Sequence, residues 1–275
     1  WRQSYSDAAL AEIVALKDAA ARRGIRIMVA IAPCLDITYS DPGELRTLLG
    51  RIDQLRGIGI EGFVLLFDDI PNRLPEVDQP HFRSFAAAHV HVTNAVMDHL
   101  RANGDGELIF CPTEYCARFA GGDVRKSEYL ATLGETLDPD VHVFWTGPEI
   151  VSPEIPADSL REIGAVLRRK PLIWENFHAN DYDIRRVNAG PLGGRKQDIL
   201  PLIAGFITNP NNELEANFVP VRTTGAFLGE GTYDPDAALD EAVAAWRPRF
   251  RFAYSEPAAF MDLEEIRLLT ELFYQ

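Results

Sequence analysis

The stretch Gly-Phe-Val-Leu-Leu-Phe-Asp-Asp-Ile-Pro occupies residues 62–71 and decides the fold of this chain. Its apolar run, residues 63–67, is short enough for a strand and too continuous for a strand with one face in water, so it predicts a buried parallel strand. Asp68 and Asp69 follow where that strand leaves the core, and ligands of parallel α/β folds bind at that end. The two carboxylates are either ordinary turn residues or a pair whose different surroundings give them different roles.

The composition bounds the size of the fold and the classes of partner. The 275 residues are 47% hydrophobic and 25% charged, which suits one barrel-sized domain or two smaller ones. Acidic residues outnumber basic residues by 41 to 27, and the net charge of -14 repels phosphate backbones and anionic lipid headgroups. We therefore expect neither a nucleic acid nor a membrane as a partner, and no apolar run approaches the length of a membrane span.

The cysteines indicate a reduced compartment. Cys34, Cys111 and Cys116 cannot all pair, and no Cys/His cluster has the spacing of a four-ligand zinc site. From this we expect no metal and a cytoplasmic location. Cys111 follows a predicted strand and fits a small core residue better than a nucleophile, because no histidine lies in an obvious supporting position.

A helix followed by a strand recurs along the chain. The strands are predicted to start at intervals of 30 to 44 residues, near residues 25, 63, 107, 141, 171 and 205. This rhythm calls for right-handed parallel crossovers, and the polar and aromatic residues after each strand match the catalytic face of a (β/α)8 barrel. Six of the eight units of such a barrel are visible, so the sheet is either open and doubly wound or lacks its first two units. No G-x-G-x-x-G follows a strand, which disfavours a dinucleotide fold.

The pattern changes beyond Asn209, where further helices are predicted over residues 213–227, 235–246 and 261–273. We expect residues 1–228 to form the barrel, without its first two βα units, and residues 229–275 to begin a helical C-terminal domain.

Several residues after the strands are candidates for a binding site. Tyr115, Trp145 and Trp174 each follow a different strand, where a ring either plugs the barrel or walls a pocket and stacks on a sugar; three in register favour a pocket. The amide and carboxylate candidates are of types that fix hydroxyl groups but are also common in loops, and they are Asn176, Asp181 and Asn209. His89 and His91 lie inside a predicted helix and indicate structural roles.

Five motifs in the same order closely resemble the family 84 glycoside hydrolases, which are β-N-acetylglucosaminidases and include the protein O-GlcNAcases. The motifs are F-V-L-L-F-D-D-I, F-C-P-T-E-Y-C, W-T-G-P-E-I-V-S-P-E-I-P, I-W-E-N-F-H-A-N-D-Y-D and T-N-P-N-N-E-L-E-A-N. The resemblance implies a (β/α)8 TIM-type catalytic barrel followed by a helical region, with no metal or other cofactor. The family's first two strands have no counterpart here, so we expect about 60 residues to precede Trp1, at ~30 for each βα unit.

The resemblance also implies roles for individual residues. Asp68 would orient and polarise the 2-acetamido N–H of the substrate, and Asp69 would be the general acid and later the base. The sugar and its acetamido group would be bound by the remaining candidates, namely Cys111, Tyr115, Ile150, Trp174, Asn176, Asp181, Tyr182 and Asn209. One departure from the family pattern is Glu175, which stands where relatives often carry Asp.

The activity implied is that of a retaining exo-β-N-acetylglucosaminidase. The substrate's own acetamide would be the nucleophile and would form an oxazoline, the stated exception to the usual pair of enzymic carboxylates. The partner would be a GlcNAc-bearing glycoside or glycoprotein, and the family pattern allows a homodimer through the C-terminal helical region.

Two other functions stay open from the sequence. A Mg²⁺-dependent barrel lyase would use Asp68, Asp69 and Glu114 as oxygen ligands, and its activity would be lost in excess EDTA. A non-catalytic GlcNAc-binding or scaffold module would account for the missing strands.

Overall fold

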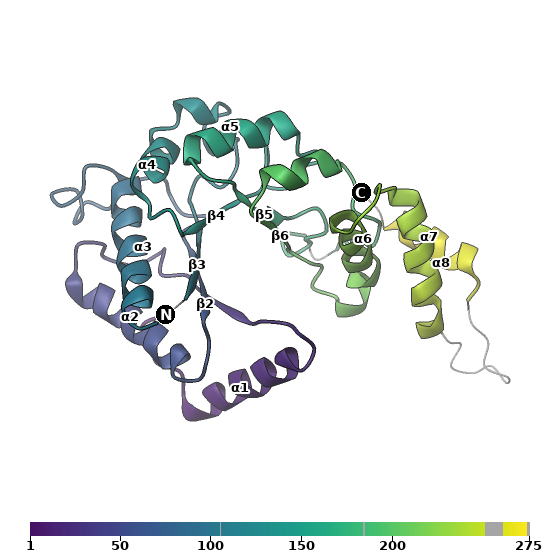
Figure 1. Ribbon diagram of the computed structural model, residues 1–275, viewed down its shortest axis with the longest axis horizontal. Coiled ribbons are helices and arrows are strands. Elements are labelled where there is room, and N and C mark those ends of the chain that lie inside the picture. The colour runs from purple at the N-terminus through teal and green to yellow at the C-terminus, as the bar shows by residue number, and fades with distance from the viewer. Residues whose placement is uncertain (105, 184, 251–260, 274–275) are drawn as a thin grey trace. The chain divides into compact units, whose positions relative to one another are not determined.

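The computed structural model describes residues 1–104, 106–183, 185–250 and 261–273. The chain divides into two compact units, in both of which strands alternate with helices (Figure 1). The first unit comprises Trp1–Trp145 and Glu162–Pro171, and the second comprises Thr146–Arg161 and Leu172–Gln275.

The first unit is built on four parallel strands that follow one another in chain order. They are β1 (Met28–Ile31), β2 (Gly62–Leu66), β3 (Glu107–Cys111) and β4 (His142–Trp145). Four of the five residues of β2 are buried, so the prediction of a buried parallel strand is confirmed. The registers of β2 and β3 place Leu66 beside Cys111, and the two strands therefore end at the same level.

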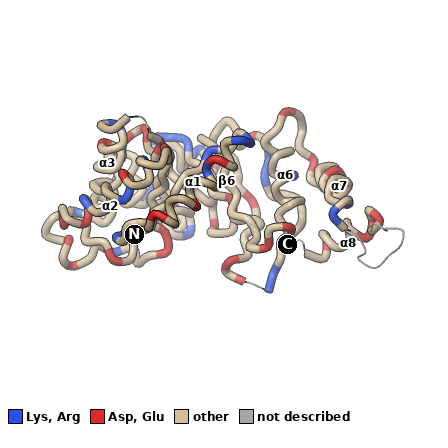
Figure 2. Tube along the Cα trace, turned by 90° about the horizontal axis from the view of Figure 1, so that it is seen from below, with Lys and Arg blue, Asp and Glu red and all other residues tan. Residues whose placement is uncertain are grey.

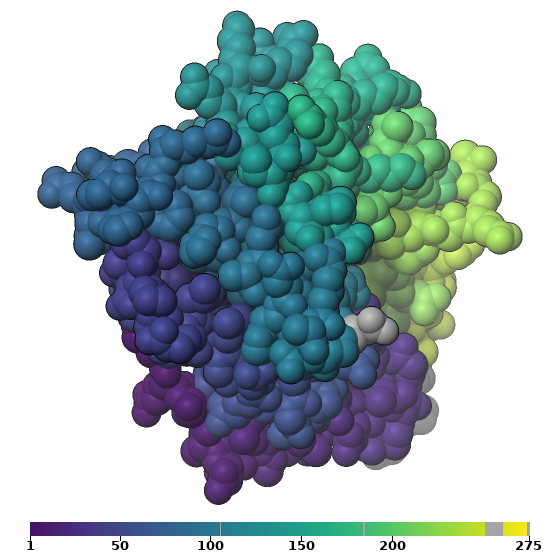
Figure 3. Space-filling model, turned by 60° about the vertical axis from the view of Figure 1, so that its left-hand side comes forward, coloured from purple at the N-terminus to yellow at the C-terminus, as the bar shows by residue number. Residues whose placement is uncertain are grey.

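The helices of the first unit begin at side-chain caps. Ser6, Asp41, Ser84 and Ser127 each accept a hydrogen bond from a backbone N–H of the first turn, as residues that start helices commonly do. The helices are α1 (Asp7–Ala21), α2 (Pro42–Arg56), α3 (Phe85–Ala102) and α4 (Glu128–Thr136). Helices α2, α3 and α4 lie along one side of the strands (Figure 1), and the purple-to-blue part of the chain forms the lower and left-hand part of the face drawn in Figure 3.

A buried histidine joins α3 to the sheet. The ring nitrogens of His89, which is 0% exposed, lie 3.0 Å from the hydroxyl of Tyr39 and 2.8 Å from the hydroxyl of Tyr129. The Tyr129 hydroxyl also accepts a hydrogen bond from the backbone N–H of Thr113, just after β3. Burial lowers the pKa of His89 to about 3, so the ring is neutral at neutral pH. The interpretation of His89 as a structural residue is therefore confirmed.

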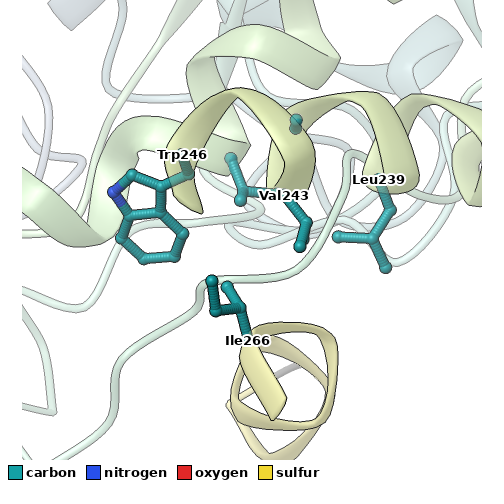
Figure 4. Packing of buried hydrophobic residues seen from close by; sticks show 6 residues of the cluster. Leu239, Val243, Trp246 and Ile266 are labelled. Carbon is teal, nitrogen blue, oxygen red and sulfur yellow. The ribbon is translucent and has the colours of Figure 1, made fainter. Parts of the chain in front are cut away.

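The second unit contains two parallel strands, β5 (Leu172–Glu175) and β6 (Gly205–Thr208), followed by helices. Helix α5 (Ala157–Leu167) precedes β5, and the C-terminal helices are α6 (Phe218–Leu228), α7 (Pro235–Trp246) and α8 (Leu263–Leu272). Leu239, Val243 and Trp246 of α7 face Ile266 of α8 (Figure 4), and Val219 of α6 completes this buried cluster. The helices predicted over residues 235–246 and 261–273 therefore share an apolar cluster with α6.

The helix–strand repeat predicts a short helix around residues 196–203 before the strand near residue 205. This helix and the one expected from residue 213 differ from the structure, each for a local reason. Residues 197–202 form the 3-10 helix η2 (Gln197–Leu202), since Pro201 lacks the N–H that an α-helix would use. The helix expected from residue 213 begins as the 3-10 turn η3 (Leu214–Asn217) and becomes α6 only at Phe218. The Asn217 side chain bonds to the backbone of Asn211 and Glu213, which competes with helical hydrogen bonding.

Acidic and basic positions are interspersed along both units (Figure 2). Among the described residues, no helix combines the length and the apolar character that a membrane crossing requires.

The contact between α4 and α5 depends on a glycine, and Gly134→Ala should destabilise the protein. A Cβ at position 134 would lie 2.0 Å from the backbone carbonyl oxygen of Val166, which cannot move without moving its helix. We expect the free energy of unfolding to fall by about 1–3 kcal/mol, as for other overpacked contacts. Gly50→Ala is the matched control in the interior of α2, because a Cβ there meets no atom within 4 Å, and it should gain up to about 1 kcal/mol. Urea denaturation of both variants measures the difference, and a similar effect of the two substitutions would contradict this account.

Candidate active site

The chain after β2 is held to the chain after β3. The Phe67 N–H donates to the Cys111 carbonyl at 3.0 Å, which extends the sheet pairing by one residue. The Thr113 hydroxyl then donates to the Phe67 carbonyl at 2.7 Å. Asp68 and Asp69 therefore leave the sheet from a fixed point at the carboxyl ends of these strands, as predicted.

Asp69 has an unusual backbone conformation. Its φ of 52° lies in the left-handed region, which residues other than glycine seldom adopt and which Asp and Asn tolerate better than most. The Asp69 side chain is exposed, and its carboxylate accepts a 2.7 Å hydrogen bond from the Tyr115 hydroxyl. Backbone strain of this kind persists where surrounding contacts hold it, and it concentrates at functional sites.

The two neighbouring carboxylates differ in their surroundings. Asp68 is half-buried, and desolvation, with a smaller contribution from the charge of Asp69, raises the pKa of its carboxyl group. Burial and the Asp69 carboxylate raise the pKa of the Tyr115 hydroxyl, which therefore remains protonated and serves as a donor. A carboxylate with a raised pKa is a stronger hydrogen-bond acceptor, so Asp68 suits an N–H donor on a ligand.

Cys111 lies at the end of β3 and is 3% exposed. Burial and the nearby carboxylates raise the pKa of its thiol well above the usual value. A thiol that stays protonated is a poor nucleophile, in agreement with its interpretation as a small core residue.

Glu114 is buried between Thr113 and Tyr115, and both of its carboxylate oxygens are engaged. One oxygen accepts a 2.6 Å hydrogen bond from the Asn72 side-chain amide, and the other accepts from the Ser127 hydroxyl. Sequence reasoning offered Glu114 only as a metal ligand and missed Asn72 and Ser127. In the described part of the chain, no three His, Cys, Asp or Glu side chains converge as a metal site would need.

A pocket of about 450 Å³ opens beside the general-acid candidate. It is lined by Asp69, Ile70, Asn72, Thr113, Glu114 and Phe119. The Phe119 ring packs edge-on against the Tyr115 ring, with ring centroids 5.1 Å apart. The pocket therefore combines polar groups with one aromatic side chain next to the Asp69 carboxylate.

Three predicted residues meet in the second unit: Ile150, which precedes α5, and Asn176 and Asn209, which follow β5 and β6. The Asn176 side-chain amide donates to the Ile150 carbonyl at 2.8 Å, and the Asn209 amide donates to the Asn176 side-chain oxygen at 3.1 Å. The Asn209 backbone N–H also donates to the Glu175 carbonyl at 2.7 Å, which continues the β5–β6 pairing. These contacts fix two amide side chains of the kind that bind hydroxyl groups.

The remaining predicted residues lie at or after the strand ends, and Trp145 and Trp174, which we expected to follow their strands, belong to β4 and β5 because the sheet pairing extends further than the apolar runs. Trp174 is half-buried in β5, whereas Asp181 and Tyr182 are exposed in the loop after β5. Their proposed contacts with a sugar remain predictions. Trp145 is 1% exposed at the end of β4, which agrees with the alternative that its ring is a plug of the core.

Sequence reasoning missed a buried ion pair that lies next to Asn176 and holds the loops around it. Glu175, between Trp174 and Asn176, accepts hydrogen bonds at 2.6 and 2.7 Å from the guanidinium of Arg195, and both side chains are at most 1% exposed. Arg195 also donates to the carbonyls of Ser152, Pro153 and Gly193. The signal in the sequence for this ion pair was Glu175 itself, because an acidic residue at the end of a buried strand is stabilised by a cationic partner.

Comparison with known proteins identifies the family. The family model described as beta-N-acetylglucosaminidase matches residues 1–261. This chain belongs to the β-N-acetylglucosaminidase family. Family 84 is thereby confirmed, and the family is one of glycoside hydrolases.

Two curated relatives of this chain are named protein O-GlcNAcase. The chain is 44% identical over 224 residues to the protein O-GlcNAcases of Mus musculus and of Rattus norvegicus, a match that covers 81% of the chain. It spans 24% of the length of these curated relatives.

The structure resembles a mutant O-GlcNAc hydrolase from Thermobaculum terrenum, with a TM-score of 0.84 and 29% identity over 90% of this chain and 53% of that one. The six βα units therefore belong to a TIM-type barrel, and the alternative of a doubly wound fold is set aside.

Loss of Arg195 should unfold the second unit more readily. Arg195→Met leaves the Glu175 carboxylate buried without its cation, and we expect a cost of about 3–5 kcal/mol in the free energy of unfolding. Arg2→Met is the matched control, since Arg2 forms exposed ion pairs with Asp36 and Glu44 and such pairs contribute about 1 kcal/mol or less. Guanidinium denaturation compares the two variants. Equal losses would show that burial of the Arg195 pair does not matter.

Asp68→Asn should stabilise the folded protein at neutral pH. Because the folded-state pKa of Asp68 is raised, its contribution to stability declines as pH rises from its usual pKa of 3.8 through the raised value. The variant should therefore melt higher at neutral pH, by about 2–4 °C for each kcal/mol gained, and the difference should shrink toward pH 4.

Asp123→Asn provides a control of opposite sign. The pKa of Asp123 is lowered to about 2, mainly by its hydrogen bond with Arg125, so the substitution should slightly lower the melting temperature at neutral pH. Calorimetry across pH measures both variants, and a loss of stability in Asp68→Asn at neutral pH would refute the destabilising desolvation assigned to the Asp68 carboxylate.

Proposed function

We propose that the protein is a retaining exo-β-N-acetylglucosaminidase that removes terminal β-linked GlcNAc, with O-GlcNAc on Ser or Thr of proteins as the substrate class. The observation that carries the proposal is the arrangement after β2, where a half-buried Asp68 adjoins an exposed Asp69 held by Tyr115. Membership of the family and 44% identity to proteins named O-GlcNAcase support the same activity.

The proposed reaction needs no enzymic nucleophile. The acetamide carbonyl oxygen of the substrate attacks the anomeric carbon, and the bond from that carbon to the leaving oxygen breaks. Asp69 gives its proton to the leaving oxygen. Asp68 accepts a hydrogen bond from the acetamide N–H and stabilises the positive charge that develops on nitrogen. Water then attacks the oxazoline at the anomeric carbon, Asp69 takes up the proton, and the configuration is retained.

The geometry suits this division of labour. Asp68 is partly withdrawn from water, and the low local dielectric strengthens its interaction with a cationic N–H. Asp69 is exposed beside a pocket that a leaving group can enter. In this proposal Tyr115 and Trp174 line the acetamido pocket, with Cys111 near its floor. The sugar and its acetamido group are bound by Asn176, Asp181 and Asn209, and the site is flanked by Ile150 and Tyr182.

The lyase alternative is weaker than this proposal. It requires Glu114 to ligate Mg²⁺, but both Glu114 oxygens already accept hydrogen bonds, from Asn72 and Ser127. A carboxylate held in this way would have to give up one donor to bind a cation.

Three further expectations belong to the same proposal. Residues 1–228 would form the catalytic part and residues 229–275 would begin a helical domain. A homodimer through that helical region is supported by an apolar pocket of about 650 Å³, whose lining includes Trp246, Phe250 and Leu269. The odd number of cysteines, Cys34, Cys111 and Cys116, favours a reducing compartment such as the cytoplasm.

Fluorination of the substrate's N-acetyl methyl group tests the proposed nucleophile. Fluorine withdraws electron density from the carbonyl oxygen with little change in size, so kcat/KM should fall progressively from the acetyl to the trifluoroacetyl substrate. The measurement uses para-nitrophenyl glycosides and the full-length protein in excess EDTA. A flat series, or a trapped glycosyl-enzyme ester, would argue for an enzymic nucleophile, and loss of all activity in EDTA would revive the metal-dependent lyase.

A further inference from the structure

We propose that Glu114 is a positioning residue that holds the general acid Asp69 in its working conformation through Asn72. This inference rests on the proposed function, because it concerns how the acid of that reaction is held. Glu114 and Asn72 line the pocket beside Asp69, but neither transfers a proton nor binds the acetamido group in the proposed reaction.

The first step of the argument is the set of contacts between the two strand ends. The segment after β3 holds the segment after β2 at successive points. Thr113 binds the Phe67 carbonyl, Tyr115 binds the Asp69 carboxylate, and Glu114 binds the Asn72 amide. Of these three contacts, only the Glu114–Asn72 hydrogen bond holds a residue that comes after Asp69 in the chain. It therefore fixes the far end of the turn that begins at Phe67.

The second step is the backbone of that turn. Asp69 is at a φ of 52° while its side chain is exposed, so packing of its own side chain contributes little to holding this conformation. Contacts on both sides must maintain it. The Phe67 contacts hold the chain before Asp69, and the Asn72–Glu114 hydrogen bond holds the chain after it.

The third step is the rigidity of Glu114 itself. The side chain is 8% exposed, and its second oxygen accepts from Ser127, the residue that caps α4. A carboxylate buried between two donors has little freedom, since loss of either donor would leave an oxygen without a partner. Glu114 therefore fixes the turn that carries Asp69 relative to the start of α4.

The position of Asp69 matters most when the leaving group is poor. A general acid has to lie within hydrogen-bond reach of the leaving oxygen, and small displacements of catalytic groups cost large factors in rate. Release of Asn72 from Glu114 would let the turn relax and the Asp69 carboxylate move. A substrate with an activated leaving group needs little protonation and would be affected much less.

The test compares two substrates in each variant of the full-length protein. The readout is the ratio of kcat/KM for methyl β-GlcNAc to kcat/KM for para-nitrophenyl β-GlcNAc. The amount of folded enzyme cancels in this ratio, so a merely structural loss does not change it. We expect the ratio to fall about tenfold in Asn72→Ala and in Glu114→Ala, and about 100-fold in Asp69→Asn, where the acid itself is lost.

Three further variants sharpen the test. The double variant Asn72→Ala/Glu114→Ala should show the same ratio as either single variant, because both substitutions remove the same hydrogen bond. Glu114→Gln should keep most of the ratio, because the Asn72 amide can rotate to satisfy a neutral amide. Ser84→Ala removes a helix cap on α3, as a control for lost stability, and should leave the ratio unchanged.

The outcomes separate this inference from the proposed function. An unchanged ratio in Asn72→Ala and Glu114→Ala, together with a lowered ratio in Asp69→Asn, would overturn the positioning role alone. Absence of hydrolysis of both glycosides by the unmodified protein would overturn the proposed function and the inference with it. Should Glu114→Ala fail to fold, Asn72→Ala decides the matter, because Asn72 is an exposed residue.

Discussion

The parallel pairing of β2 with β3 is the constraint on which the candidate site depends. The register places Leu66 beside Cys111, and the Phe67 N–H continues the pairing beyond the last strand residue. Alternate residues of a strand face opposite sides, so a shift of one residue would exchange the surroundings of Asp68 and Asp69. The difference between a half-buried and an exposed carboxylate is therefore set by backbone hydrogen bonds before any side chain contributes.

The site is also continuous with the core of the first unit. Tyr129 joins the Thr113 backbone to His89, and His89 joins Tyr129 to Tyr39. Each of these buried groups has a hydrogen-bond partner, as groups removed from water require. In the second unit, Arg195 has the corresponding role, because its guanidinium holds Glu175 and three carbonyls of neighbouring loops. Buried polar networks of this kind fix one arrangement of the loops and exclude others.

Local sequence patterns predicted the elements of this fold well. The strands predicted to start near residues 107 and 205 begin at Glu107 and Gly205, and Ser6 and Asp41, residue types that commonly cap helices, begin α1 and α2. These features depend on neighbouring residues, and a continuous apolar run or a capping side chain records them in the chain. The resemblance to family 84 then favoured the barrel over a doubly wound sheet and added Ile150 and Tyr182 to the candidate residues, which no local pattern indicated.

The contacts that organise the site could not be predicted in the same way. Arg195 lies 20 residues from Glu175, and Asn72 lies 42 residues from Glu114. Such pairs form only when the strand ends come together, so the sequence holds no periodic or local record of them. A charged residue within an apolar strand end, as at Glu175, is a weak hint that a partner exists but does not identify it.

The left-handed backbone of Asp69 has a consequence for the evolution of this family. Glycine and asparagine are the residues that best accept such a backbone, and each is one base change away from aspartate in the genetic code. Replacement by either would keep the turn and discard the proton donor. The position that the proposed chemistry needs most is thus among the easiest to lose without loss of the fold, and relatives that have become binding proteins should have glycine or asparagine there.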